Sequence, residues 1–103
     1  TISVQMPKNL TIAVLDNEHF GETGMQKSHT GYGVDLVGIA HSSGFPISRE
    51  LTNMSEIEVA REEILQNNGP MFLNIKINSQ SPDRSLPTLD GVELKNRFRT
   101  SLK

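Results

Sequence analysis

Apolar residues along the chain occur in short runs that are separated by polar and glycine-rich connections. The first run, residues 10–15, is rich in β-branched residues and predicts a strand buried on both faces, as in a parallel sheet. Residues 46–51 and 71–77 predict two further strands. The pattern therefore predicts a sheet whose faces are covered by the segments between its strands.

Two of those segments carry signals for the start and end of a helix. Asp35 begins an apolar pattern that predicts a short helix, capped by Asp35 and ended by Gly44. Ser55 and Glu58 have the spacing of a capping box, which predicts a second helix that runs through Asn67. Both helices would pack against the predicted sheet.

The two ends of the chain also have helical patterns. Residues 89–103 predict a terminal helix with basic residues in its last turns, and residues 1–6 predict the end of a helix stopped by Pro7. The order of elements predicts an α/β fold, a three-layer parallel sheet with flanking helices. Because the chain starts inside an element, we expect residues 1–103 to be a single partial domain, the C-terminal portion of a larger one.

Ligands of such sheets bind at the carboxyl ends of the strands, which places the expected site just after Leu15. Polar residues with possible metal ligands gather there, and these are Asp16, Asn17, Glu18, His19 and Glu22. Their carboxylate, amide and carbonyl oxygens suit Mg²⁺ better than Zn²⁺. The same composition is also typical of an acidic, solvated turn that binds nothing.

Residues 20–33 contain four glycines among polar residues, which argues against a helix or a packed strand. Backbone N–H groups of such a loop could bind phosphate, although no known phosphate-loop motif is present. His19 and His29 lie in this polar region, where an imidazole could act as an acid or a base. His41 falls on the predicted short helix and is expected to be a surface or packing residue.

Composition narrows the possible partners. Ten Lys and Arg against twelve Asp and Glu give a net charge of −2, which argues against nucleic-acid binding. The absence of Cys and of a long apolar stretch favours a cytoplasmic protein without a membrane span. Only 35% of residues are hydrophobic, so we expect a small core that gains stability from oligomerisation.

One stretch is more specific than composition. From residue 15 to residue 30 the chain reads Leu-Asp-Asn-Glu-His-Phe-Gly-Glu-Thr-Gly-Met-Gln-Lys-Ser-His-Thr. This stretch resembles the diphosphate-binding domain of thiamine diphosphate-dependent decarboxylases, most closely the phosphonopyruvate and sulfopyruvate decarboxylase branch. Residues 35–44, 69–72 and 86–99 continue the resemblance, which thus covers nearly the whole chain.

The resemblance implies roles for individual residues. The cofactor motif of that family closes with an Asn-Asn or Asp-Asn pair, which Asp16 and Asn17 match. The Asn17 side chain and the backbone carbonyl of His19 would bind the Mg²⁺ that bridges the two phosphates of thiamine diphosphate. The residues that would lie along the diphosphate are Gly21, Glu22, Thr23 and Gly24. The segment that closes over the active site would include Gln26, Ser28 and His29, with His29 as the candidate catalytic residue.

The chain also departs from the family pattern. No Gly-Asp-Gly precedes Asn17, and Met25 stands where the family has a glycine. The activating Glu of the family lies on a separate pyrimidine-binding domain. We therefore expect the diphosphate- and Mg-binding portion of a 2-oxo acid decarboxylase, inactive without the missing Gly-Asp-Gly segment and a pyrimidine-binding domain or subunit. The alternatives are an acetolactate-synthase-like carboligase, a 2-oxo acid oxidoreductase subunit, or a non-catalytic α/β interaction module.

Overall fold

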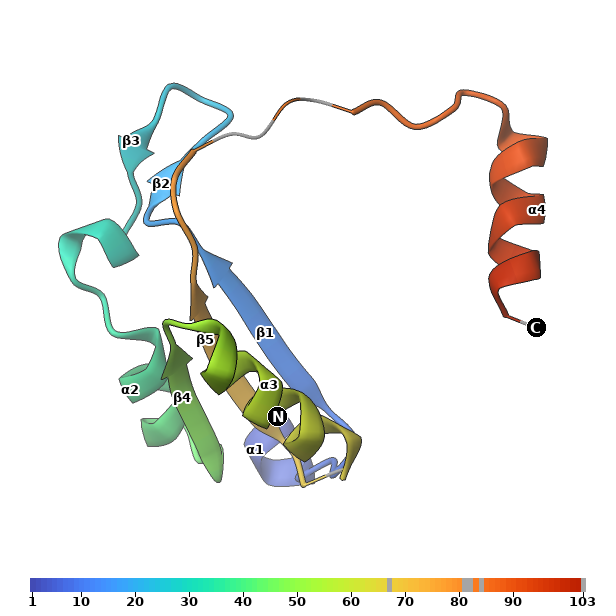
Figure 1. The fold of residues 1–103 in the computed structure, drawn as a ribbon. Helices are drawn as coiled ribbons and strands as arrows, with labels where there is room; N and C mark the ends of the chain where they lie inside the picture. Colours follow the sequence, from blue (N-terminus) through green and yellow to red (C-terminus); the bar gives the residue numbers. More distant parts are fainter. Residues whose placement is uncertain (67, 81–82, 84, 103) are drawn as a thin grey trace.

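A parallel three-stranded sheet forms the centre of the computed structural model, which describes residues 1–66, 68–80, 83 and 85–102 (Figure 1). The strand order is β1 (Thr11–Asp16), β5 (Met71–Lys76), β4 (Ile47–Leu51). Both outer strands run parallel to β5, and the first residue of each, Thr11 and Ile47, pairs with Met71 in the ladder. The predicted parallel sheet with flanking helices is therefore confirmed.

The central strand is β5 rather than β1. Met71, Leu73 and Asn74 of β5 are buried, whereas Ala13 and Leu15 of β1 are exposed. The prediction that residues 10–15 are buried on both faces is thus wrong. A β-branched run cannot distinguish an edge strand from a central one, because the connections between strands decide which strand lies in the middle.

Helices cover the two faces of the sheet unequally. On one face, α3 (Met54–Leu65) packs Ala60 and Ile57 against the cluster around Met71 and Leu73. On the other face, α2 (Leu36–Ser42) is followed by Phe45, whose ring meets that of Phe72 edge to face at 6.1 Å. The short α1 (Ile2–Gln5), at the position predicted for a helix end, lies next to Gly44 at the end of this second layer.

The cap of α3 differs from the prediction. Asn53, not Ser55, is the N-cap, and its side chain accepts a hydrogen bond from the Glu56 backbone N–H. The Glu56 carboxylate in turn accepts a hydrogen bond from the Asn53 backbone N–H, which completes the capping box. The predicted pair of Ser55 and Glu58 is wrong because Asn53 is an equally good cap two residues earlier. The helix ends at Leu65, and Asn67, its predicted end, lies outside the described residues.

The cap of α2 agrees with the prediction at its start. The Asp35 carboxylate accepts from the Gly38 N–H at 2.8 Å. The helix ends at Ser42, two residues before Gly44, which takes a left-handed conformation with φ 94°. Gly44 therefore follows the C-cap rather than forming it.

The glycine-rich segment contains more regular structure than predicted. It forms a small antiparallel ribbon of β2 (His19–Phe20) and β3 (Gln26–Lys27), followed by the 3-10 turn η1 (Thr30–Tyr32). The strand residues of the ribbon after His19 are exposed, so the prediction that this segment contains no packed strand is confirmed. This ribbon projects from the carboxyl end of the sheet (Figure 1).

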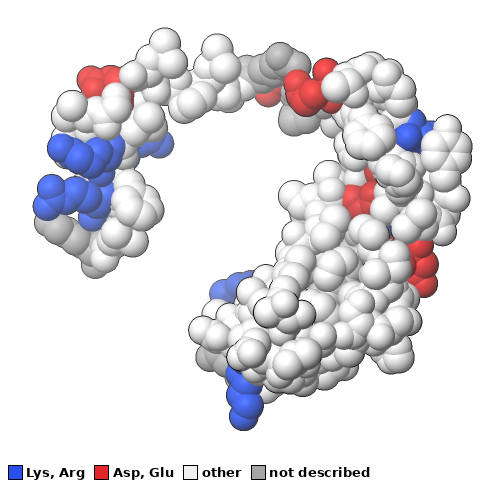
Figure 2. Space-filling model, turned by 180° about the vertical axis from the view of Figure 1, so that it is seen from behind, with Lys and Arg blue, Asp and Glu red and all other residues white. Residues whose placement is uncertain are grey.

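The terminal helix α4 (Gly91–Ser101) stands away from the sheet at the end of an extended connection (Figure 1). Its N-cap is Asp90, whose carboxylate accepts from the Val92 and Glu93 N–H groups. Every residue of α4 is exposed, and its Lys and Arg side chains gather visibly on it in Figure 2. In the described part of the chain, no helix is long and apolar enough to cross a membrane.

The capping box of α3 gives a direct test of the fold. Asn53→Ala removes the acceptor for the Glu56 N–H and should lower the free energy of unfolding by about 1 kcal/mol. Ser55→Ala, in the first turn of the same helix, is the matched control and should change it by less than about 0.5 kcal/mol. Urea unfolding measures both, and a larger loss for Ser55→Ala would contradict the observed cap.

Candidate functional site

A buried carboxylate lies at the carboxyl end of β1. Asp16 is 5% exposed, and its two oxygens accept hydrogen bonds from four donors. These are the Glu18 backbone N–H at 2.9 Å, Thr30 Oγ1 at 2.6 Å, Lys76 Nζ at 2.9 Å and Asn74 Nδ2 at 3.3 Å. Burial raises the pKa of Asp16, but these hydrogen bonds outweigh it and lower the pKa to about 2. Asp16 is therefore ionised at neutral pH.

Lys76 and Asn74 extend this network across the sheet. Lys76 Nζ also donates to Glu18 Oε1 at 2.7 Å, and hydrogen bonds to Glu18 and Asp16 raise the pKa of Lys76. Asn74 Nδ2 lies 3.2 Å from Glu50 Oε2, so it joins Asp16 of β1 to Glu50 of β4. The network thus fixes the carboxyl ends of all three parallel strands against one another.

The residues after Asp16 form a tight turn. Asn17 Oδ1 accepts from the His19 backbone N–H at 3.0 Å, and His19 Nδ1 lies 2.9 Å from the Asn17 backbone oxygen, to which its N–H donates. Glu18 between them has φ 62°, in the left-handed region. The Asn17 side chain is therefore turned back over the loop, with its oxygen next to the His19 backbone.

A later segment packs against this turn. The Glu18 carbonyl accepts from the Ser28 N–H at 2.8 Å, and Thr30 donates to Asp16. A Cβ on Gly31 would lie 2.5 Å from the Glu18 carbonyl oxygen, so only glycine fits this close approach. Residues 28–31 are thus held against the turn by contacts at three positions.

The residues predicted to bind diphosphate form the turn of the ribbon. Thr23 Oγ1 donates to Gln26 Oε1 at 3.2 Å, and Gly24 has φ 113°. Met25, which replaces a glycine of the family pattern, has φ 61°. A glycine would adopt this left-handed conformation without strain, whereas Met25 adopts it at some cost. Gly21 and Glu22 lie in the same turn.

The histidines occupy different surroundings. His19 belongs to the turn just described, and His29 is exposed immediately before η1, next to Thr30. His41 is exposed in the last turn of α2, as expected for a surface residue. The structure therefore brings His19 and His29 to the same end of the sheet and leaves His41 outside it.

The polar residues predicted to be metal ligands do not come together as one cluster of His, Asp and Glu side chains. Among the described residues, no three His, Asp or Glu side chains are placed to hold a metal ion together. Asp16 already accepts hydrogen bonds from four donors. The Asn17 side-chain oxygen and the His19 carbonyl lie together in one turn. A Mg²⁺ that takes most of its ligands from phosphate and water needs only such a small number of protein oxygens. The turn fits that kind of site.

Four members of the network were missed by the sequence analysis, namely Thr30, Glu50, Asn74 and Lys76. Asn74 and Lys76 lie in the predicted strand 71–77, near its carboxyl end, where ligand sites of parallel sheets gather. That position is the signal that could have identified them. Thr30 ends the stretch that carries the family resemblance, but nothing in its spacing indicated a contact with Asp16.

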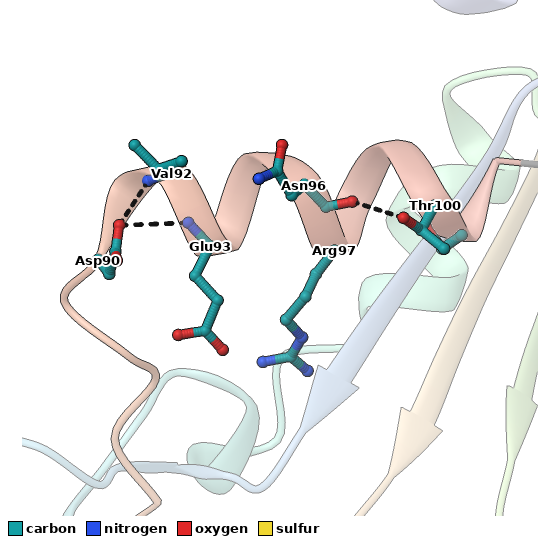
Figure 3. Close-up of a pocket in the computed structure, with 7 residues that line it drawn as sticks. Asp90, Val92, Glu93, Asn96, Arg97 and Thr100 are labelled. Atoms are coloured by element: carbon teal, nitrogen blue, oxygen red, sulfur yellow. Dashed lines mark hydrogen bonds between the residues drawn. The ribbon is translucent and has the colours of Figure 1, made fainter.

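A surface hollow also occurs on α4, far from this edge of the sheet (Figure 3). Its lining consists of Asp90, Val92, Glu93, Asn96, Arg97, Thr100 and Ser101. All of them belong to one exposed helix and its cap, so the hollow is a helix face rather than an enclosed pocket.

Comparison with known proteins points to one group of enzymes. The chain is 31% identical over 98 residues to the β subunit of sulfopyruvate decarboxylase from Methanothermobacter thermautotrophicus, which covers 95% of this chain and 50% of that one. It is 31% identical over 104 residues to the same subunit from Methanocaldococcus jannaschii, covering 100% and 54%. This chain is homologous to the β subunit of sulfopyruvate decarboxylase. The predicted resemblance is thereby confirmed.

A further relative is the phosphonopyruvate decarboxylase of Streptomyces viridochromogenes, 29% identical over 100 residues, or 96% of this chain and 25% of that one. The chain thus spans about half the length of the sulfopyruvate decarboxylase subunits that it matches. No protein-family model matches this chain. No solved structure matches it significantly either.

The buried carboxylate predicts a pH-dependent stability. The pKa of Asp16 falls from 3.8 to about 2 on folding, so its contribution of about 2 kcal/mol is complete well above pH 4 and is lost as the pH falls toward 2. The difference in unfolding free energy between the wild type and Asp16→Asn should therefore shrink by about 1 kcal/mol from pH 7 to pH 3. Urea titrations at both pH values measure it, and a constant difference would contradict the network.

Proposed function

We propose that this chain is the part of a thiamine diphosphate-dependent 2-oxo acid decarboxylase that binds the cofactor's diphosphate through Mg²⁺. The observation that supports this proposal is the Asn17–His19 turn at the carboxyl end of β1, followed directly by the exposed glycine-containing ribbon turn. Homology to sulfopyruvate and phosphonopyruvate decarboxylases supports the same reaction class.

Two oxygens of the turn would hold the metal, the Asn17 side-chain oxygen and the His19 backbone carbonyl. Asp16 would not be a ligand; its carboxylate is saturated by donors and instead holds the turn in place. The ribbon turn would lie along the diphosphate, where exposed N–H groups and the Thr23 hydroxyl suit phosphate oxygens. Mg²⁺ with phosphate ligands is the combination that a site with few protein oxygens accommodates.

When bound, thiamine diphosphate supplies the carbon nucleophile and the electron sink for loss of CO₂ from a 2-oxo acid. The chain's own residues bind and orient the cofactor, and His29 holds or releases a proton near the substrate. His29 directly precedes Thr30, whose hydroxyl donates to Asp16. The Asp16 network would therefore hold the His29 backbone close to the Asn17 turn. An imidazole suits this role because its usual pKa lies near neutral pH.

The pyrimidine end of the cofactor would be bound by another domain or subunit, and the chain would be inactive alone. Two relatives are named as β subunits, which supports a partner subunit. The substrate would be a small 2-oxo acid carrying a sulfonate or a phosphonate, since the named relatives act on sulfopyruvate and phosphonopyruvate. These names favour a decarboxylase over a carboligase or an oxidoreductase subunit.

Asn17→Ala tests the metal site. Removal of the side-chain oxygen should raise the Mg²⁺ and thiamine diphosphate concentrations needed for half-saturation by about tenfold or more. The measurement is calorimetric titration of the chain assembled with its partner subunit, with thermal stabilisation by the ligands as a second readout.

Asn96→Ala, an exposed asparagine on α4, is the matched control for this variant and should leave both concentrations unchanged. Asn17→Asp keeps an oxygen at the position and should bind more tightly than Asn17→Ala. Unchanged cofactor saturation in Asn17→Ala would contradict the proposal.

His29→Ala tests the catalytic assignment separately. Because His29 is not placed among the diphosphate contacts, the variant should lose about 100-fold or more in kcat while its affinity for Mg²⁺ and cofactor stays the same. His41→Ala, exposed on α2, is the control. A variant that weakens cofactor affinity but keeps kcat would refute the assignment of His29.

A further inference from the structure

Glu18 occupies the middle of the proposed metal-binding turn, between Asn17 and His19. Its φ of 62° lies in the left-handed region, which is unfavourable for a residue with a long side chain. A backbone conformation of this kind persists only where surrounding contacts hold it. The contacts of Glu18 therefore decide the shape of the turn.

The side chain of Glu18 is held by a lysine of the central strand. Lys76 Nζ donates to Glu18 Oε1 at 2.7 Å and to Asp16 Oδ2 at 2.9 Å. Lys76 lies opposite Asp16 in the ladder between β1 and β5, and its ammonium group reaches from there to the turn that follows β1. The side chains of Lys76 and Glu18 are 28% and 45% exposed, so the ion pair is partly shielded from water.

The backbone of Glu18 joins the turn to the segment that precedes η1. The Glu18 carbonyl accepts a hydrogen bond from the Ser28 N–H at 2.8 Å. A Cβ on Gly31 would lie 2.5 Å from the same carbonyl oxygen, so this later segment packs directly on Glu18. His29 lies in the segment, between Ser28 and Gly31. A rotation of the Glu18 peptide would thus move the His29 backbone together with the metal-binding turn.

We propose that Glu18 is a positioning residue which, held by Lys76, couples the metal-binding turn to the His29 segment. Occupation of the turn by Mg²⁺ and diphosphate then fixes the Glu18 peptide and, with it, the backbone of His29. This coupling rests on the proposed function and adds that cofactor binding and the placement of His29 depend on each other. Glu18 is not itself a metal ligand, because its carboxylate is paired with Lys76.

Glu18→Asn tests the coupling. Asparagine tolerates the left-handed conformation, but its side chain is shorter and uncharged, so the ion pair with Lys76 is lost. In the chain assembled with its partner subunit, the Mg²⁺ and thiamine diphosphate concentrations for half-saturation should rise about tenfold, and kcat at saturating cofactor should fall about tenfold. The substrate is sulfopyruvate or phosphonopyruvate, whichever the wild type converts. Asp16 keeps its four donors in this variant, so the sheet edge should stay folded.

Two further variants serve as controls. Glu58→Asn removes a carboxylate from an exposed position on α3 and should leave both half-saturation and kcat unchanged. Lys76→Arg keeps a cation that can donate to both carboxylates and should retain most of the wild-type affinity and kcat.

Amide hydrogen exchange gives a readout that needs no cofactor. In the assembled protein without cofactor, the Ser28 amide should exchange about tenfold faster in Glu18→Asn than in the wild type, because its acceptor is less firmly held. The amides of β5 are the internal control, since a general loss of stability would speed their exchange as well.

The two readouts separate the coupling from other roles of Glu18. A Glu18→Asn variant that loses only cofactor affinity, only kcat, or neither would overturn the coupling. Equal acceleration of the Ser28 and β5 amides would overturn it too, in favour of a purely structural role. If Asn17→Ala leaves cofactor saturation unchanged, the proposed function fails, and exchange of the Ser28 amide still decides whether Lys76 holds the Glu18 peptide.

Discussion

The arrangement of the candidate site depends on one buried, ionised carboxylate. Asp16 is held by donors from three separate places in the chain, namely the turn that follows it, the segment at Thr30, and β5 with Asn74 and Lys76. A buried carboxylate is costly unless its oxygens are hydrogen-bonded, so these places must come together for the edge to be stable. The positions of the Asn17 turn and of the His29 segment follow from that requirement.

Local signals predict most elements of the fold. Asp35 marks the start of α2, and the three apolar runs give the three parallel strands. Predictions fail where the outcome depends on which strands lie side by side, or on which of two equally suitable residues caps a helix. Burial of residues 10–15 depends on strand order, and the start of α3 depends on a choice between Asn53 and Ser55, both good caps.

The residues of the candidate site divide in the same way, into those that local signals predict and those that only tertiary packing brings together. Asn17 and His19 are two residues apart and close to the predicted strand end, so spacing and resemblance identify both. Three of the four partners of Asp16 are 14, 58 and 60 residues away in the sequence, at Thr30, Asn74 and Lys76. No spacing rule reaches over such distances, because tertiary packing alone brings these residues together. The polar group that organises the site was thus predicted, but its distant partners were not.

The most direct test of the account is to locate the metal. Mn²⁺ in place of Mg²⁺, added with thiamine diphosphate to the assembled protein containing isotope-labelled chain, broadens the NMR signals of nearby amides. The account predicts selective broadening from Asn17 to Gly24, with the amides of α2 and α4 unaffected. Broadening centred elsewhere, or none at these residues under saturating cofactor, would contradict the claim that this edge of the sheet binds the diphosphate.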